Sequence, residues 1–86
     1  MKDLEKILKA LANKRRLAIL KHLKLRGTAT VTNIAREIKL SFRSTSKHLG
    51  ILSAFDIIEK NQQGPHVFYK LSKNQAPAAK YVISLL

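Results

Sequence analysis

The most constraining feature of this sequence is the order in which its apolar residues change their spacing. Apolar residues recur at intervals of three and four along most of the chain, which is the pattern of amphipathic helices. One later stretch alternates apolar and polar residues, as strands do, before helical spacing returns. The sequence therefore predicts helices over residues 3–12, 14–26, 31–38 and 41–55, a β-hairpin over 57–71, and a last helix from Pro77.

Local signals support the first three helices. Asn13 is a good N-cap for the second helix, and Gly27 suits its end. The third helix, VTNIAREI, has only about two turns, so we expect it to depend on tertiary contacts. The apolar stripe of the first helix consists of Leu4, Ile7, Leu8 and Leu11.

The stretch LSFRSTSKHL predicts a fourth helix with one cationic, hydroxyl-rich face. Ser41 is its expected N-cap. At 100° per residue, Arg43, Lys47 and Gly50 lie on the side away from the core. A glycine costs about 1 kcal/mol relative to alanine inside a helix, so Gly50 indicates that another molecule comes close to this face. The expected core face consists of Thr45, Leu49 and Leu52.

The segment after Asp56 predicts the hairpin and the last helix. The runs IIEKN and VFYKL alternate in polarity around the turn residues QQGPH. Pro77 suits the first turn of the helix that follows. One side of that helix is formed by Ala78, Tyr81, Val82 and Leu85.

The charge of the chain points to a polyanionic partner. Seventeen Lys and Arg against five Asp and Glu give a net charge of +12, which is more than solubility requires. Nucleic acid is the leading candidate. A well-solvated lysine surface and an anionic membrane surface are the alternatives.

The remaining composition limits the class of protein. The absence of cysteine excludes disulfides and thiolate metal sites, and it fits a reducing cytoplasm. Lysines interrupt the apolar residues of the first 20 positions, so we expect neither a signal peptide nor a membrane span. Residues 1–86 are therefore predicted to form one cytoplasmic domain, mainly α with a small β-hairpin, in the order α-α-α-α-β-β-α of a winged helix-turn-helix.

Three stretches also resemble a known family. LKALANKRRLAILKHL, NIAREIKLSFRSTSKHLGIL and IIEKNQQGPHVFYKL resemble, in the same order, the ArsR family of winged-helix repressors. The resemblance covers roughly residues 4–72. It implies a homodimer built from the first and last helices, with Ser41–Phe55 as the recognition helix and the hairpin as the wing.

The sequence departs from the family at several positions. Thr30 and Thr32 stand where many members have metal-binding cysteines. The three histidines lie in different predicted elements, so we expect no metal and no cofactor. Phe42 stands where the family often has glutamine, which changes the expected base preference. Asp56 stands where it usually has glycine, which is expected to strain or lengthen the end of the recognition helix.

These observations predict a transcriptional regulator that acts as a repressor. The recognition helix, residues 41–55, is expected in the major groove of duplex DNA, with the wing, residues 57–71, near the minor groove. The predicted DNA-binding residues are Ser41, Phe42, Arg43, Ser44, Ser46, Lys47, His48, Lys60, Gln62, Gln63 and His66. The predicted dimer interface consists of Leu4, Ile7, Leu11, Ala78, Tyr81, Val82 and Leu85.

Other functions fit the sequence less well. The five carboxylates are scattered and no nucleophile motif occurs, so we do not expect an enzyme. A winged helix can also serve as a protein-interaction or RNA-binding module, because a fold does not determine function. A small-molecule or protein effector cannot be identified from these residues.

Overall fold

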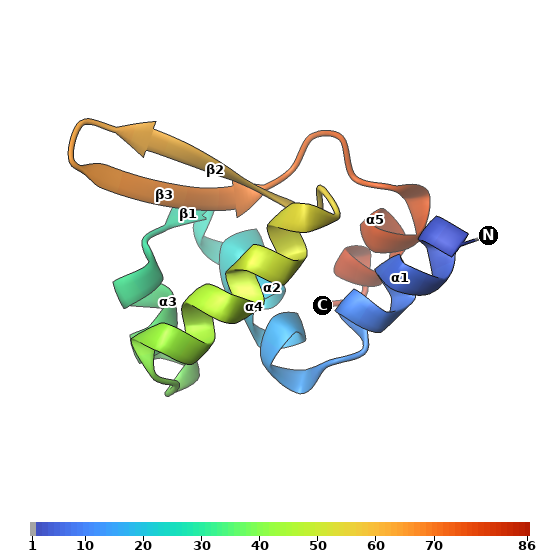
Figure 1. Ribbon diagram of the computed structural model, residues 1–86, viewed down its shortest axis with the longest axis horizontal. Helices are drawn as coiled ribbons and strands as arrows, with labels where there is room; N and C mark the ends of the chain where they lie inside the picture. Colours follow the sequence, from blue (N-terminus) through green and yellow to red (C-terminus); the bar gives the residue numbers. More distant parts are fainter. Residues whose placement is uncertain (1) are drawn as a thin grey trace.

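The order of helices and strands follows the predicted order with one addition. The computed structural model describes residues 2–86, so Met1 of the predicted domain lies outside the described residues. Figure 1 shows the hairpin at one end of the molecule and the first and last helices at the other. The elements are α1 (Lys2–Leu11), α2 (Lys14–Arg26), β1 (Thr28–Ala29), α3 (Val31–Ile38), α4 (Phe42–Ala54), β2 (Ile58–Gln63), β3 (His66–Leu71) and α5 (Pro77–Ser84).

The predicted boundaries of α2 are confirmed, and local hydrogen bonds explain them. The side chain of Asn13 accepts hydrogen bonds from the backbone amides of Arg15 and Arg16 at 3.0 and 3.1 Å. At the other end, Gly27 has a φ of +85°, and its amide donates to the carbonyl of Leu23 at 2.8 Å. Both ends thus satisfy backbone groups that would otherwise lack partners.

Strand β1 was not predicted from the sequence. Thr28 and Ala29 pair with Lys70 and Tyr69 of β3, which makes a three-stranded antiparallel sheet in the order β1-β3-β2. A strand of two residues is too short to show alternation. Strand β1 forms only when these two residues pair with β3 in the folded protein.

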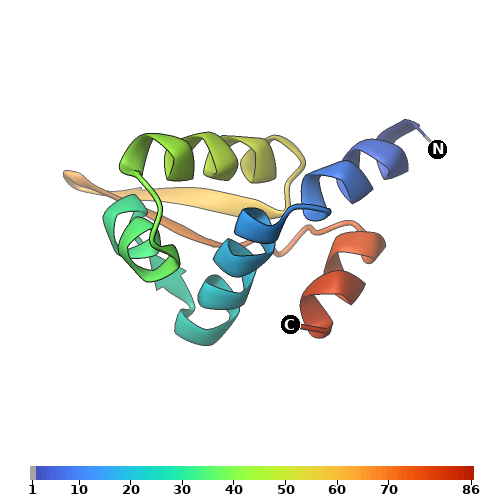
Figure 2. The ribbon, with the colours of Figure 1, turned by 90° about the horizontal axis from the view of Figure 1, so that it is seen from below.

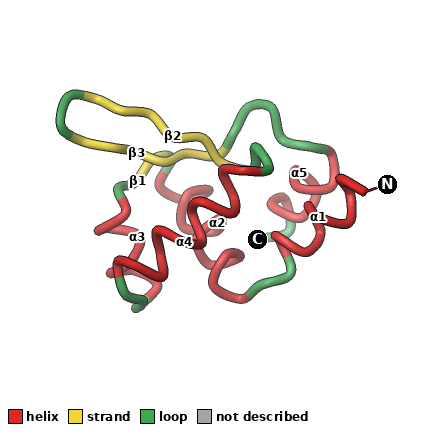
Figure 3. The backbone as a smooth tube through the Cα atoms, in the orientation of Figure 1, coloured by secondary structure: helices red, strands yellow, loops and turns green. Residues whose placement is uncertain are grey.

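The hairpin has a tighter turn than predicted. Strand pairing continues to Gln63 and His66, so the turn consists of Gly64 and Pro65 alone. Gly64 has a φ of +61°, which glycine adopts without strain. After β3, residues 72–76 form an open loop to α5 (Figure 3), which the amide of Ser72 ties to the carbonyl of Ile57 at 3.1 Å.

Helix α2 is the centre of the core, and its basic side chains bind the ends of other helices. Its buried residues Ile19, Leu20 and Leu23 pack among apolar residues of every other helix. Lys24 Nζ donates to the carbonyl of Ile83 in the last turn of α5 at 3.1 Å. The ends of α1 and α3 receive similar hydrogen bonds from α2, as described below. Cations at helix C-termini stabilise the carbonyls left unpaired there.

Helices α1 and α5 lie side by side in both ribbon views (Figures 1 and 2), and they expose only part of the predicted interface. Tyr81 and Leu85 are each 67% exposed, and Leu4 is 41% exposed. Leu11 is only 3% exposed, so the structure places it in the protomer core, where it cannot contribute an interface contact. Leu11 is buried because the C-terminal end of α1 packs against α2. Ile7, Ala78 and Val82 are half-buried, and Leu8, which was not assigned to the interface, is 47% exposed.

Within residues 2–86, none of the helices has the length and apolar character needed to cross a membrane.

Candidate nucleic-acid interface

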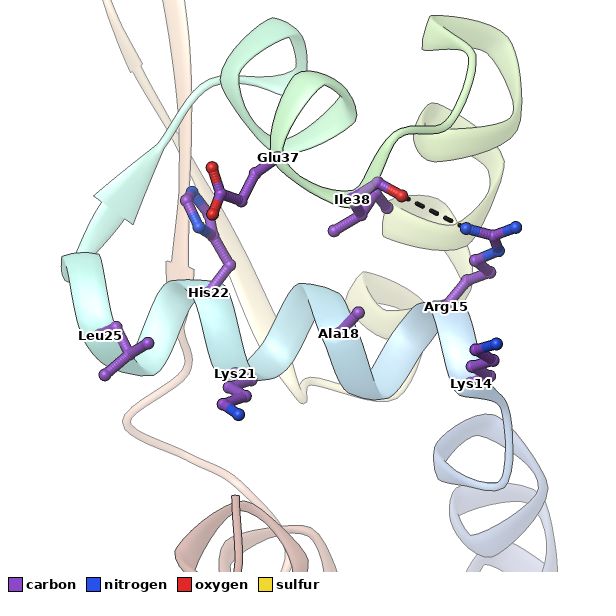
Figure 4. A pocket seen from close by; sticks show the side chains of 8 residues that line it. All are labelled: Lys14, Arg15, Ala18, Lys21, His22, Leu25, Glu37 and Ile38. Carbon is purple, nitrogen blue, oxygen red and sulfur yellow. Dashed lines mark hydrogen bonds between the residues drawn. The ribbon is translucent and has the colours of Figure 1, made fainter.

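Helices α3 and α4 form a helix-turn-helix whose turn is fixed by backbone geometry. Lys39 takes the left-handed conformation with φ of +56°, and the amide of Leu40 donates to the carbonyl of Ala35 at 3.0 Å. This arrangement ends α3 as a Schellman motif does. Arg15 Nη1 donates to the carbonyl of Ile38 at 3.2 Å, which fastens the turn to α2 (Figure 4). The start of α4 is therefore held on the core.

Helix α4 begins at the predicted cap and buries the predicted face. The side-chain oxygen of Ser41 accepts a hydrogen bond from the amide of Ser44 at 3.1 Å. Thr45, Leu49 and Leu52 have no exposed surface. Because three successive turns of the helix are anchored in this way, the opposite face is rigid.

That opposite face carries the predicted cations. Arg43 and Lys47 are exposed, and Phe42 beside them is 59% exposed. Ser44 and Ser46 flank the face and are half-buried, whereas Ser41 at the cap is exposed. The surface thus presents fixed positive charge, hydroxyls and one aromatic ring along a single helix.

Gly50 continues this face without a side chain. A Cβ atom added there would meet no atom within 4 Å, so packing inside the protomer does not require glycine. The predicted reason, close approach of another molecule, is consistent with this open space.

His48 lies between the core and the cationic face, and Arg16 holds its ring. Arg16 Nη1 and His48 Nδ1 are 3.1 Å apart. The guanidinium can only donate, so Nδ1 accepts and the proton of the neutral ring lies on Nε2. Burial, together with the positive charges of Arg16, Lys47 and Arg15, lowers the pKa of His48 from its ordinary value. The ring therefore offers an N–H donor on the nitrogen that does not face Arg16.

The predicted wing residues divide between two faces of the hairpin. Side chains alternate along a strand, so Lys60 and Gln62 share the face of buried Ile58. Gln63 and its register partner His66 lie on the other face. All four predicted residues are exposed. The sequence does not determine the register of the hairpin, so these four residues could not be divided between its faces beforehand.

The start of α4 and the tip of the wing come together in space. Phe42 and His66, from different elements, line one cavity of about 340 Å³. Its full lining is Thr30, Val31, Thr32, Phe42, Pro65, His66 and Val67. The two predicted DNA-binding segments thus form neighbouring parts of one surface, as Figure 2 shows for α4 and the hairpin.

The histidines that could bind a metal lie in separate parts of the structure. Over residues 2–86, no three His, Cys, Asp or Glu side chains lie close enough to hold a metal ion. His22 lies beside Glu37 in a groove between α2 and α3 (Figure 4), His48 lies on α4 and His66 on β3. Thr30 caps α3 by accepting a hydrogen bond from the amide of Asn33 at 3.2 Å.

Arg16 was not among the predicted site residues. Its contact with His48 joins positions 32 residues apart, and no local spacing signals such a pair. Asn61 was also missed. It is exposed in β2 between Lys60 and Gln62, where its side chain points to the opposite face.

Solved structures share this architecture. Reduced HlyU from Vibrio cholerae N16961 matches with a TM-score of 0.82 and 33% identity, over 99% of this chain and 85% of HlyU. Mb0332 from Mycobacterium bovis, described as a homodimeric winged helix-turn-helix DNA-binding domain and a possible ArsR-family transcriptional regulator, matches with a TM-score of 0.81 and 26% identity. That match covers 98% of this chain and 74% of the Mb0332 fragment.

This chain belongs to the ArsR family of winged helix-turn-helix transcriptional regulators. A third neighbour, the transcriptional repressor PagR of Bacillus anthracis, has a TM-score of 0.81 and 27% identity, over 98% of this chain and 92% of PagR. No protein-family model matches the sequence, and no curated protein sequence does. The predicted fold and the family resemblance are confirmed, and membership of the ArsR family places the chain among regulators rather than enzymes.

Proposed function

We propose that this ArsR-family chain is a repressor that binds specific sequences of duplex DNA as a homodimer. The observation that carries the proposal is the exposed face of α4, which presents Arg43 and Lys47 on a helix anchored by three fully buried residues. A single α-helix fits the major groove of B-DNA. Such an assembly acts on the genome, so we also place it in the cytoplasm.

The two cations of α4 suit different parts of DNA. The planar guanidinium of Arg43, in the first turn, can make two hydrogen bonds to the edge of a guanine. Lys47, one turn later, carries a compact charge suited to a phosphate. His48 adds a neutral N–H donor on Nε2, which can donate to a phosphate oxygen beside Lys47. The remaining residues of this part of the proposed site are Ser41, Phe42, Ser44 and Ser46.

The wing supplies a second contact to the same duplex. Lys60 and Gln62 lie on the face that continues the core side of the hairpin, whereas Gln63 and His66 lie on the other face near the tip. We propose that the tip lies along the minor groove, so that amides from both faces reach its walls. The cavity between Phe42 and His66 then lies where a DNA backbone passes from one groove to the next.

The proposed dimer uses the far end of the protomer. Leu4, Leu8, Tyr81 and Leu85 are large apolar residues left exposed on α1 and α5. Mb0332 is described as homodimeric. Two-fold symmetry would present two α4 helices to two half-sites of one operator. The proposed activity requires no metal and no cofactor.

Selection of bound sequences from random duplex DNA tests this function. We expect a recurring motif with two related half-sites, and binding that a scrambled duplex or an RNA of the same sequence competes for weakly. Enrichment of no motif, or equal competition by RNA, would contradict sequence-specific duplex binding and favour the RNA-binding alternative. Unchanged affinity in Arg43→Ala would exclude α4 as the reading element.

A further inference from the structure

A shallow, open cleft lies between α1 of the proposed dimer interface and α4, the proposed recognition helix. Its volume is about 380 Å³, which falls within the range of small-molecule sites. The α1–α4 cleft is lined by Lys6, Lys9, Ala10, Arg16, Ile51 and Phe55.

The lining of the α1–α4 cleft has an apolar floor and a cationic edge. Ile51 and Phe55 are half-buried and pack against the core, which leaves part of each side chain facing the cleft. Lys6 and Lys9 are exposed, and none of the lining residues is acidic. Glu5 lies 3.8 Å from Lys9, but both side chains are largely exposed, so water screens this pair. A ligand that matches this lining has an apolar body and an anionic head.

Arg16 connects the α1–α4 cleft to the recognition helix. It donates through Nε to the carbonyl of Ala10, through Nη2 to the carbonyl of Lys9 at 3.2 Å, and through Nη1 to His48 at 3.1 Å. A guanidinium has five N–H donors, so these three contacts leave two N–H groups without a partner in the described part of the chain, one on each terminal nitrogen. An anion that binds these two N–H groups shares Nη1 with His48, so its attraction can shift the guanidinium relative to His48.

We propose that the α1–α4 cleft binds an amphipathic carboxylate, such as a medium-chain fatty acid, and that binding releases the protein from DNA by drawing Arg16 away from His48. The alkyl chain covers Ile51 and Phe55, and the carboxylate lies among Lys6, Lys9 and Arg16. The binding step stands on the lining of the cleft alone. The release step rests on the proposed DNA-binding function, because it acts through the position of α4.

Nuclear magnetic resonance of the free protein tests the binding step. Decanoate, kept below its micelle concentration, is titrated while the ring protons of the three histidines are followed. His48 contacts Arg16, whereas His22 lies in the α2–α3 groove and His66 in the wing, so the last two are internal controls. We expect saturable shifts at His48 alone. Equal shifts at all three histidines would overturn the site.

Probe and protein variants separate the two halves of the ligand. Octanoate should bind at least about twofold more weakly than decanoate, because each buried methylene contributes to affinity. Decyltrimethylammonium should not bind. The double variant Lys6→Gln/Lys9→Gln should weaken decanoate about threefold to tenfold, whereas Lys21→Gln, an exposed lysine of α2, should not. Equal affinity for the cationic probe, or an equal loss with Lys21→Gln, would overturn the proposal.

The release step is measured with operator DNA in the same buffer. Decanoate should lower the DNA affinity of the unaltered protein at least about tenfold, and it should have little effect on His48→Gln, where the contact with Arg16 is changed. Binding of decanoate without any loss of DNA affinity would contradict the release step and leave the binding step standing. If Lys6→Gln/Lys9→Gln alone reduced DNA affinity far more than Lys21→Gln, the cleft lysines would be phosphate contacts, and the proposal would fail.

Discussion

Gly50 lies on the exposed face of α4, one turn beyond Lys47, with open space around its Cα. Gly50→Ala should raise the free energy of unfolding by about 1 kcal/mol, because alanine has the higher helix propensity. The same methyl group should weaken operator binding by about 1–3 kcal/mol if DNA packs against the helix backbone there. Urea unfolding and DNA titration measure the two effects. A gain in stability with unchanged DNA affinity would show that the groove does not reach Gly50.

Asp56 strains the end of α4 and does not lengthen the helix, so the first of the two expected effects is found. Its φ is +56°, and the amide of Ile57 donates to the carbonyl of Leu52 at 3.1 Å, so Asp56 occupies the position that favours glycine in a Schellman motif. Asp56→Gly should stabilise the protein by about 1 kcal/mol in thermal unfolding, because it removes this strain and an anion near a helix C-terminus.

Lys39 provides a matched comparison for that substitution. It has the same φ of +56° at the end of α3, but its charge is favourable there. Lys39→Gly should therefore stabilise less than Asp56→Gly. A larger gain at Lys39 would show that charge at the helix end has little part in the effect.

His48 makes stability depend on pH. Its pKa in the folded protein lies below the ordinary value of 6.5. As pH falls through 6.5, the unfolded chain binds a proton at His48 while the folded chain does not, so folding stability should decrease until pH reaches the lowered pKa. The unfolding free energy of the protein minus that of His48→Gln, measured between about pH 7.5 and pH 5, should decrease as pH falls. Parallel curves would refute this assignment.

At the scale of elements, the helix boundaries and faces that depend on residues close in the sequence were predictable. Asn13, Gly27 and Ser41 mark helix ends through contacts within three or four residues, so the boundaries of α2 and the start of α4 came directly from local chemistry. The buried face of α4 followed from helical periodicity in the same way.

The parts that depend on distant pairing were not predictable. Strand β1 exists only because Thr28 meets Lys70. The register of the hairpin decides that Lys60 and His66 lie on different faces. Leu11 has the spacing of an exposed stripe, but contact with the core buries it. In each case the deciding contact lies far away in the sequence, where periodicity carries no information.

Arg43 and Lys47, both exposed on α4, should contribute to DNA binding in different ways. Arg43→Ala should cost about 1–3 kcal/mol on the specific operator and relax the preference at one base pair. Lys47→Ala should weaken all duplexes alike and lower the slope of log affinity against log salt by about one per subunit. Titrations of both variants on specific and scrambled duplexes, at several salt concentrations, measure these effects. Identical behaviour of the two variants would rule out this division.

At the scale of the whole molecule, charge and apolar surface lie at different places. Some of the cations behind the net charge of +12 make hydrogen bonds within the protomer, where side chains of α2 bind the ends of α1, α3 and α5. The exposed cations of α4 lie on a different part of the surface from the apolar residues of α1 and α5. One protomer can therefore contact DNA and a second protomer at the same time.

The proposed dimer gives the last prediction. Tyr81 and Leu85 are each 67% exposed on α5, so replacing them does not disturb the core. Tyr81→Lys/Leu85→Lys should convert a dimer into a 9.7 kDa monomer, because two lysines would be brought against the same surface of a partner. Light scattering measures the mass, and circular dichroism should show unchanged helix content. Operator affinity should fall at least about tenfold, since each half-site would bind separately.

The control for this prediction is Leu25→Lys on α2. Leu25 is 73% exposed and lines the α2–α3 groove. It adds one of the two positive charges of the double variant at a similarly exposed apolar position, so it should leave the dimer intact. Dissociation by Leu25→Lys as well would show that net charge, rather than contact through α5, controls association. A dimer that survives Tyr81→Lys/Leu85→Lys would place the interface elsewhere on the protomer.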